Sequence, residues 1–368
     1  MSHSSKEMIS FFITTRCNLD CIYCYTNKGT VKHQHQTLDW EFAKLGIDDY
    51  YTTQYKRHIR FFGAGEPTEE IDLIEQIYRY AKKKDKATTS EIQTNGCFSV
   101  EVADWLAQNV DIIWISCDGP PKIQDEYRPM LSGESSSEKI DENIQRMMPQ
   151  KHTGIIGIRA TITNRNYDKQ IELIDHYSRL GIKNFWVDPI FPSIGEKVPV
   201  GGNLDMGRFT KHFIQAVKYA YDNGLTYGSI LTCNFDEPGE YACRALLPVP
   251  HLTSDGYVSA CDMALFGEDA NHMDIFMYGK WDKANHCIIY DEKKIRTLRS
   301  RSLAKILQLS DSPCAHCSVA PFCRGYCPGE VVNETYDLFG CKKTVCKPVV
   351  NIFDSLSDRE KSYIFSHP

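Results

Sequence analysis

The chain has 368 residues and a mass of 42.1 kDa. This exceeds one ordinary domain of about 100 to 200 residues, so we expect either a large barrel or two linked domains. Its 42% hydrophobic and 24% charged residues, with a formal net charge of -6, are typical of a folded globular protein. No apolar run approaches the roughly 18 residues of a membrane span, and the acidic balance offers no broad basic surface. We therefore expect no membrane or nucleic-acid partner, but a small-molecule or polypeptide substrate.

Short apolar runs alternate with longer amphipathic ones from residue 8 to about 190, which is the pattern of strand and helix units around a parallel sheet. Six such units predict an α/β fold, a partial (β/α)6 TIM-like barrel. The expected strands cover residues 8–14, 58–63, 90–95, 111–116, 154–163 and 184–191, and the expected helices cover 38–51, 71–84, 100–107, 138–148 and 168–180.

The rest of the chain is organised differently. Residues 192–205 are rich in Pro and Gly and predict a linker, and 206–222 predict a helix. A hairpin is expected at 254–261 and a charged helix near 293–308. We therefore divide the chain into a barrel (1–205), a bridging helix and strand segment (206–232) and a small cysteine-rich domain (233–368) with a hairpin and helices.

Fifteen cysteines are the main clue to function. Their odd number, their clustering and the polar start of the chain argue against a secreted disulfide scaffold, and clustered thiols indicate metal. Cys97, Cys117 and Cys287 stand apart from the clusters and are expected to be buried in the core.

The first cluster, Cys17, Cys21 and Cys24, directly follows the first expected strand. Three thiolates can hold three irons of a four-iron, four-sulfur (4Fe-4S) cube and leave the fourth iron open. A zinc site would need another ligand, for which His33 and His35 are available, and usually has a two-residue gap within each pair. The spacing favours the iron-sulfur cube.

This segment, CNLDCIYC, resembles the CxxxCxxC motif of the radical S-adenosylmethionine (radical SAM) family, with Tyr23 as the aromatic residue before the third cysteine. The resemblance implies that S-adenosylmethionine chelates the open iron through its amino and carboxylate groups. It also implies that one electron from the cube cleaves the cofactor to methionine and a 5′-deoxyadenosyl radical, which abstracts a hydrogen atom from the substrate.

Further segments resemble family motifs, each at the end of an expected strand or within one, and barrel enzymes place their sites at strand ends. FFGAGEP resembles the GGEP motif that binds the methionyl ammonium, with Ala64 replacing the commoner glycine. QTNG and ISCDGPPKIQDEYRP resemble the loops after the next two strands; they imply that Ser116 and Asp118 lie near the ribose and Arg128 near the cofactor carboxylate or the substrate. The full set of implied cofactor-binding residues is Tyr23, Gly63, Gly65, Glu66, Gln93, Asn95, Ser116, Asp118, Arg128 and Arg159.

The C-terminal cysteines resemble the SPASM domain, through Gly256-x4-Cys261 and then C-x2-C-x5-C-x3-C from Cys314 to Cys327. The resemblance implies two auxiliary 4Fe-4S clusters, three in the chain altogether. The implied ligands are Cys243, Cys261 and Cys327 for the first auxiliary cluster, and Cys314, Cys317, Cys323 and Cys346 for the second.

Two of the cluster-ligand assignments stay open. Cys233 is the candidate fourth ligand of the first auxiliary cluster, unless one iron is left open for substrate. Cys341 competes with Cys346, although a gap of 18 residues after Cys327 fits the pattern better than 13. A structural zinc knuckle is the alternative for the whole tail, because two-residue gaps also suit zinc.

Radical SAM proteins with such a tail mostly modify peptides or proteins, so the resemblance implies an oxidoreductase that acts on a polypeptide. After hydrogen abstraction, an auxiliary cluster would accept a second electron and leave a crosslink or another modified residue. We expect a flavodoxin- or ferredoxin-type reductant and an anaerobic cytoplasm, because the cubes are oxygen-labile. Since Cys17 leaves no room for an N-terminal leader-binding domain, a ribosomal peptide would be recognised by the barrel, the tail or a separate leader-peptide-binding protein.

Two alternatives remain. The first is an anaerobic sulfatase maturase, which oxidises a Cys or Ser to formylglycine; Asp262, next to Cys261, matches a position where those enzymes carry a carboxylate thought to remove the substrate proton. Asp262 fits a hydrogen-bonded hairpin residue equally well. The second is a non-catalytic iron-sulfur electron carrier or a zinc-stapled binding protein, which would have no use for CxxxCxxC followed by GAGEP.

Overall fold

The computed structural model describes residues 8–24, 26, 35–53, 57–151, 153–192, 201–268, 271–310 and 312–364. His33 and most of the expected linker lie outside these residues. Among the described residues, no helix is both long enough and apolar enough to cross a membrane.

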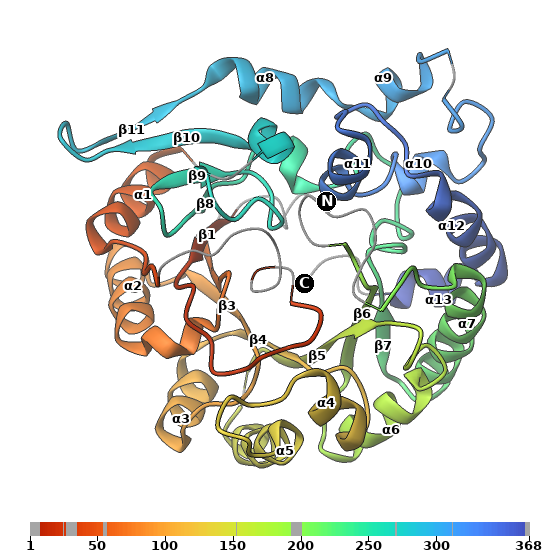
Figure 1. Ribbon diagram of the computed structural model, residues 1–368, viewed down its shortest axis with the longest axis horizontal. Helices are drawn as coiled ribbons and strands as arrows, with labels where there is room; N and C mark the ends of the chain where they lie inside the picture. The colour runs from red at the N-terminus through yellow and green to blue at the C-terminus, as the bar shows by residue number, and fades with distance from the viewer. Residues whose placement is uncertain are drawn as a thin grey trace.

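All six expected barrel strands are present and run parallel in chain order. Helices cover their outer side, so the strands lie inside a ring of helices (Figure 1). The expected fold class, an α/β partial barrel with a cysteine-rich C-terminal region, is confirmed. The strands are β1 (Ile9–Phe12), β2 (His58–Phe62), β3 (Thr89–Thr94), β4 (Ile112–Ser116), β5 (Ile155–Ile162) and β6 (Asn184–Pro189), and the helices are α1 (Trp40–Thr53), α2 (Ile71–Lys84), α3 (Val100–Asn109), α5 (Ser136–Met147), α6 (Gln170–Arg179) and α7 (Met206–Asp222).

The helices form where the sequence pattern places them because each has one apolar face and a defined start. In α2, Ile74, Ile77 and Ala81 recur at spacings of three and four and are fully buried against the sheet. Ser99 and Ser135 cap the first turns of α3 and α5 by accepting hydrogen bonds from backbone N–H groups. The strand residues are mostly buried, as is usual for parallel strands covered on both faces, although β3, TSEIQT, has only one apolar residue.

The cysteine-rich region continues the barrel sheet. Strand β8 pairs in parallel with β1, and three antiparallel strands follow it, while β7 extends the sheet beyond β6. Helices α12 and α13 pack against α7 on the other side, so the region reaches from β1 to α7 (Figure 1). The added strands are β7 (Thr226–Gly228), β8 (His251–Leu252), β9 (Tyr257–Ser259), β10 (Met277–Asp282) and β11 (Cys287–Tyr290), and the added helices are α8 (Glu292–Ser300), α9 (Leu303–Leu307), α10 (Ala320–Cys323), α11 (Pro328–Thr335), α12 (Lys343–Ser355) and α13 (Asp358–Tyr363).

The hairpin expected at 254–261 is confirmed as the β8–β9 connection. The single charged helix expected at 293–308 is wrong, because α8 and α9 are separate. Between them Arg301 is 1% exposed and donates to the carbonyls of Leu338 (2.5 Å) and Gly325 (2.8 Å), which turns the backbone inward. Ser302 then starts α9 as its cap.

Three further features were not expected. Helix α4 (Pro121–Tyr127) lies within the ISCDGPPKIQDEYRP segment, and β10 and β11 form a second hairpin. Cys97 and Cys117 are buried as expected, but Cys287 is exposed, because it lies on the edge strand β11. The prediction of a buried Cys287 is therefore wrong.

Candidate active site

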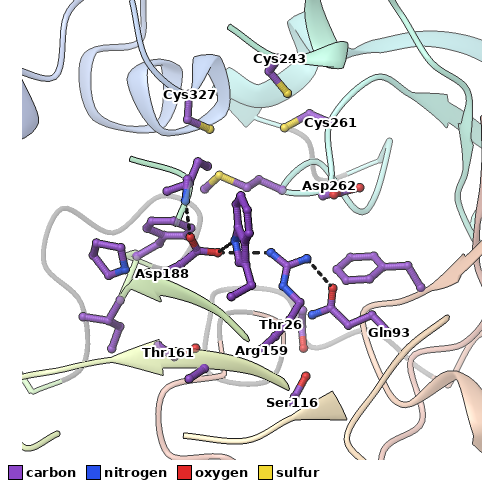
Figure 2. Close-up of a pocket in the computed structure, with 18 of the residues that line it drawn as sticks. Thr26, Gln93, Ser116, Arg159, Thr161, Asp188, Cys243, Cys261, Asp262 and Cys327 are labelled. Atoms are coloured by element: carbon purple, nitrogen blue, oxygen red, sulfur yellow. Dashed lines mark hydrogen bonds and ion pairs between the residues drawn. The ribbon is translucent and has the colours of Figure 1, made fainter. Parts of the chain in front are cut away.

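One cavity of about 390 Å³ lies at the carboxyl ends of the barrel strands, between the strand loops and the cysteine-rich region. The first cysteine group lines it on the barrel side. Cysteines of the C-terminal region line the other side, where Figure 2 shows Cys243, Cys261 and Cys327 close to one another. Of the implied site residues, Asp118, Cys314, Cys317, Cys341 and Cys346 are not part of the cavity wall.

The loop of Cys17, Cys21 and Cys24 is fixed by the helix that follows β4. The N–H groups of Asp20 and Ile22 donate to the carbonyls of Pro129 and Tyr127, at 2.9 and 3.0 Å. Burial raises the pKa of Cys17 to about 12 and that of Cys21 to about 11. The free thiols of Cys17 and Cys21 are therefore protonated near neutral pH, and a metal must displace their protons to bind.

A buried hydrogen-bond network centred on Asp118 supports the cysteine loop. Asp118 has a fully buried side chain that accepts from the guanidinium of Arg128 (3.0 Å), from the hydroxyl of Tyr23 and from the N–H of Thr161 (2.8 Å). Arg128 also lies 3.9 Å from the sulfur of Cys21. Asp118 therefore points at the loop rather than into the cavity, and so it positions the cysteines.

The GAGEP segment lies against the residues just before Cys17. The N–H of Gly65 donates to the carbonyl of Thr14 (2.9 Å) and that of Glu66 to the carbonyl of Arg16 (2.7 Å). Glu66 is 2% exposed, and burial raises its pKa although it accepts four hydrogen bonds. Three of these reach Oε1, from the N–H and hydroxyl of Thr68 and the hydroxyl of Thr94, and one reaches Oε2, from the N–H of Asn95. Oε2 thus keeps a lone pair for a cation in the cavity.

A hydrogen-bonded set of polar side chains around Arg159 forms the middle of the cavity wall. Arg159 donates to Gln93 (3.0 Å) and pairs with Asp188 (3.2 Å), and Asp188 also accepts from the indole of Trp186 (2.9 Å), as Figure 2 shows. Ser116 lies on the neighbouring strand, opposite Arg159 in the β4–β5 ladder. Together they place polar side chains of four strands around the same space.

Three of the C-terminal cysteines lie close together at the cavity. Burial raises the pKa of Cys243, Cys261 and Cys327, and the nearby Cys243 and Cys261 thiols raise that of Cys327 further. Cys233 lines the same cavity, and its pKa is raised by burial and by Cys243 and Cys323.

Of the second group, Cys323 lines the cavity, while Cys314, Cys317, Cys341 and Cys346 do not. Cys314 and Cys323 each have a raised pKa, first through burial and then through neighbouring thiols that include Cys346. Cys341 is close to the same thiols, and its sulfur is 3.9 Å from that of Cys346. Both therefore stay candidates for the last ligand.

Asp262 lies on the auxiliary side of the cavity with its side chain 35% exposed. Burial alone would raise its pKa, but Arg60, His251 and Arg244 outweigh this and hold the pKa far below its usual range. A single nitrogen of Arg60 donates to both carboxylate oxygens, at 2.8 and 2.9 Å. A carboxylate held this way is a weak proton acceptor.

The family model of the radical SAM superfamily matches residues 11–196, which is half of the chain. The chain belongs to the radical SAM superfamily. Members of this family use S-adenosylmethionine together with a 4Fe-4S cluster. The matched residues begin in β1 and end just after β6, and so they coincide with the partial barrel.

One curated relative matches the chain well beyond the barrel. The cysteine-type anaerobic sulfatase-maturating enzyme of Clostridium perfringens is 21% identical over 84% of this chain and 85% of its own length. Three further curated relatives are matched over 66%, 65% and 39% of their own length, which is less than two thirds.

Solved structures share the whole fold. Native anSMEcpe with bound AdoMet has a TM-score of 0.75 at 16% identity and covers 96% of this chain and 98% of its own. Streptococcus suis SuiB bound to its precursor peptide SuiA has a TM-score of 0.67 at 15% identity and covers 94% and 76%.

The residues of this radical SAM chain fit the cofactors of the family. The first group offers three free thiols beside the cation of Arg128, and the carboxylate of Glu66 keeps an open lone pair in the same cavity. Within the described residues, no three His, Cys, Asp or Glu side chains meet as they would around a single metal ion. The thiolates of a cube bind separate irons, and so they stand further apart than the ligands of one ion.

Gly65→Ala should disrupt the first cluster. A Cβ at Gly65 would lie 2.1 Å from the carbonyl oxygen of Arg16, and backbone cannot yield as a flexible side chain can. We expect the variant to fold but to load fewer irons and to lose most S-adenosylmethionine cleavage, measured by iron counting and 5′-deoxyadenosine release. Gly207→Ala is the matched control, because its Cβ would meet only a side-chain oxygen of Asp205 at 3.3 Å. Equal iron content in the two variants would contradict the close approach.

Several cavity residues escaped the sequence analysis. Arg60 and Asp188 are charged residues inside otherwise apolar strands, HIRFF and NFWVDP, and this irregularity was a usable signal. Trp186 reads as one more apolar strand residue. Arg244 carries no motif of its own.

Proposed function

We propose that this protein is a radical SAM enzyme that modifies a peptide or protein substrate by oxidation. The observation that carries the proposal is the shared cavity: Cys17, Cys21 and Cys24 line one side of it, and Cys243, Cys261 and Cys327 line the other. When bound, the first cube and S-adenosylmethionine supply a 5′-deoxyadenosyl radical, and an auxiliary cluster supplies an acceptor for a second electron. A substrate in this cavity would lie within reach of both.

The chain's own residues would position the cofactor and the substrate. We assign the methionyl ammonium to the open lone pair of Glu66, and the nucleoside to the wall formed by Gln93, Ser116 and Arg159. Tyr23, Asp118 and Arg128 hold the cysteine loop, while Asn95 donates to Asn18 (2.7 Å) beside the sulfur of Cys17. Gly63 and Gly65 keep the GAGEP backbone against that loop.

We assign the auxiliary ligands as the sequence pattern has them, with Cys233 as the fourth ligand of the first auxiliary cluster and Cys346 as the last ligand of the second. A polypeptide substrate is supported by SuiB, which was solved with its precursor peptide. We further propose a flavodoxin- or ferredoxin-type reductant and, for a ribosomal substrate, a separate leader-peptide-binding protein.

Deuterium transfer tests the substrate class without a known substrate. The fully loaded enzyme is incubated anaerobically with S-adenosylmethionine, reductant and a digest of perdeuterated bacterial protein. We expect deuterium in the released 5′-deoxyadenosine, measured by mass spectrometry, because the radical takes a hydrogen from a peptide carbon. Labelling only by a perdeuterated small-molecule extract would assign the enzyme to another substrate class.

The sulfatase maturase remains the second candidate, supported by the place of Asp262 directly after Cys261 in the cavity wall. Against it, Arg60 occupies both oxygens of that carboxylate. Formylglycine formation on a CxPxR peptide would favour this candidate. An electron carrier, by contrast, would release no 5′-deoxyadenosine at all.

A further inference from the structure

We propose that Arg244 binds a carboxylate of the substrate, so that the modified residue lies beside an aspartate, a glutamate or the C-terminus. The inference rests on the proposed function, since it names a feature of the polypeptide that the cavity receives. Arg244 begins the short 3-10 helix η4 (Arg244–Leu246), directly after Cys243, and lines the cavity.

The other charged side chains of the cavity wall are already paired inside the protein. Each has a partner within hydrogen-bonding distance, so none of them has its full charge available for a ligand. The pairs are Arg60 with Asp262, Arg128 with Asp118 and Arg159 with Asp188, while Glu66 accepts from Thr68, Thr94 and Asn95.

Arg244 differs from all of these. Its nearest carboxylate oxygen, Oδ2 of Asp262, lies 3.6 Å from its Nη2, which is beyond hydrogen-bond distance. Both oxygens of that carboxylate already accept from Arg60. In the part of the chain that the structure describes, the guanidinium of Arg244 donates no hydrogen bond, and its side chain is only 15% exposed. None of its nitrogens is among the buried side-chain atoms without a partner, and Arg244 lines the cavity, so its donors are open to an acceptor that enters the cavity.

A carboxylate is the group that best satisfies these donors. The planar guanidinium matches the two oxygens of a carboxylate and binds them with paired, charge-assisted hydrogen bonds. The site is also separate from the one we assign to the cofactor. Figure 2 shows Cys243, the neighbour of Arg244, across the cavity from Ser116, with Arg159 and Gln93 between them. The carboxylate of S-adenosylmethionine belongs at the first cluster, and so the ligand of Arg244 comes from the substrate.

Selection from peptide libraries tests this with two sources of carboxylate. Both are acetylated random hexapeptides. One has amidated C-termini, so that only Asp and Glu carry a carboxylate. The other lacks Asp and Glu and mixes free with amidated C-termini, so that each library also contains neutral peptides. Loaded enzyme with S-adenosylmethionine and no reductant is mixed with each library, and bound peptides are quantified by mass spectrometry. The proteins are wild type, Arg244→Gln, Arg244→Lys and the surface control Arg146→Gln.

We expect wild type and Arg146→Gln to enrich carboxylate-bearing peptides about tenfold over neutral ones. Arg244→Gln should bind both kinds equally at unchanged iron content, and Arg244→Lys should keep part of the enrichment. Enrichment in only one library identifies the side chain or the C-terminus as the source.

Equal binding of acidic and neutral peptides by wild type would overturn the inference. So would unchanged selection in Arg244→Gln with a shifted reduction potential of the auxiliary cluster, since Arg244 would then only balance the charge of that cluster. If Arg244→Gln loads less iron, the comparison of Arg244→Lys with Arg146→Gln decides. The proposed function fails on a different result, the absence of deuterium transfer from peptides in wild type.

Discussion

Joint replacement of Cys17, Cys21 and Cys24 by alanine is expected to abolish S-adenosylmethionine cleavage and to lower the iron content from about twelve to about eight per chain. The three thiols are the protein ligands that the structure offers to the first cube, and they line the cavity with Glu66. The auxiliary groups lie on the other side of the cavity and should keep their irons. The measurement is iron and sulfide per chain after anaerobic reconstitution, with 5′-deoxyadenosine release under reductant.

Cys287→Ala is the matched control, because Cys287 is exposed on β11 and belongs to no cysteine group. It should keep about twelve irons and full cleavage. If wild type instead held about four irons together with zinc, the C-terminal cysteines would bind structural zinc rather than auxiliary clusters. A fully loaded wild type that releases no 5′-deoxyadenosine would identify an electron carrier instead.

The sequence was sufficient for the barrel because most of its strands are short apolar runs and its helices have one apolar face, both of which are local patterns. The same holds for most site residues. Glu66, Gln93, Asn95 and Ser116 stand at or next to strand ends, and parallel strands bring their carboxyl ends to one edge, so motif order along the chain became proximity in space.

Contacts between segments far apart in the chain could not be predicted from the sequence. Arg60 and Asp262 are 202 residues apart, and their pairing depends on β8, a strand of two residues that carries no periodicity. This pairing changes the expectation for Asp262 from a free base to a carboxylate held between cations. That the guanidinium of Arg244 donates no hydrogen bond within the described residues is likewise visible only once the partners of the other charges in the cavity are known.

Asp118 shows the same limit in a different form. Its motif implied a place near the ribose, yet its side chain accepts from Tyr23, Arg128 and Thr161 and takes no part in the cavity wall. The short helix α4 explains this geometry, because it returns the chain so that Arg128 lies between Asp118 and Cys21.

Asp118→Asn should therefore cost about 3–5 kcal/mol of unfolding free energy, the usual effect of leaving a buried charge without its partner. Arg128 is 13% exposed and would lose its counter-charge, while Tyr23 would lose a charged acceptor. The measurement is guanidinium-induced unfolding of the apo-protein under anaerobic conditions, with the midpoint compared at constant slope.

Asp104→Asn provides the comparison, since Asp104 also pairs with an arginine, Arg146, but both side chains are about one third exposed or more. Solvent screens that pair, and the loss should stay within about 1 kcal/mol. Because Arg128 touches the sulfur of Cys21, Asp118→Asn should also load less iron at the first cluster, whereas Asp104→Asn should not. If Asp118→Asn were as stable as Asp104→Asn and loaded its iron normally but bound S-adenosylmethionine weakly, Asp118 would instead contact the cofactor, as its motif implied.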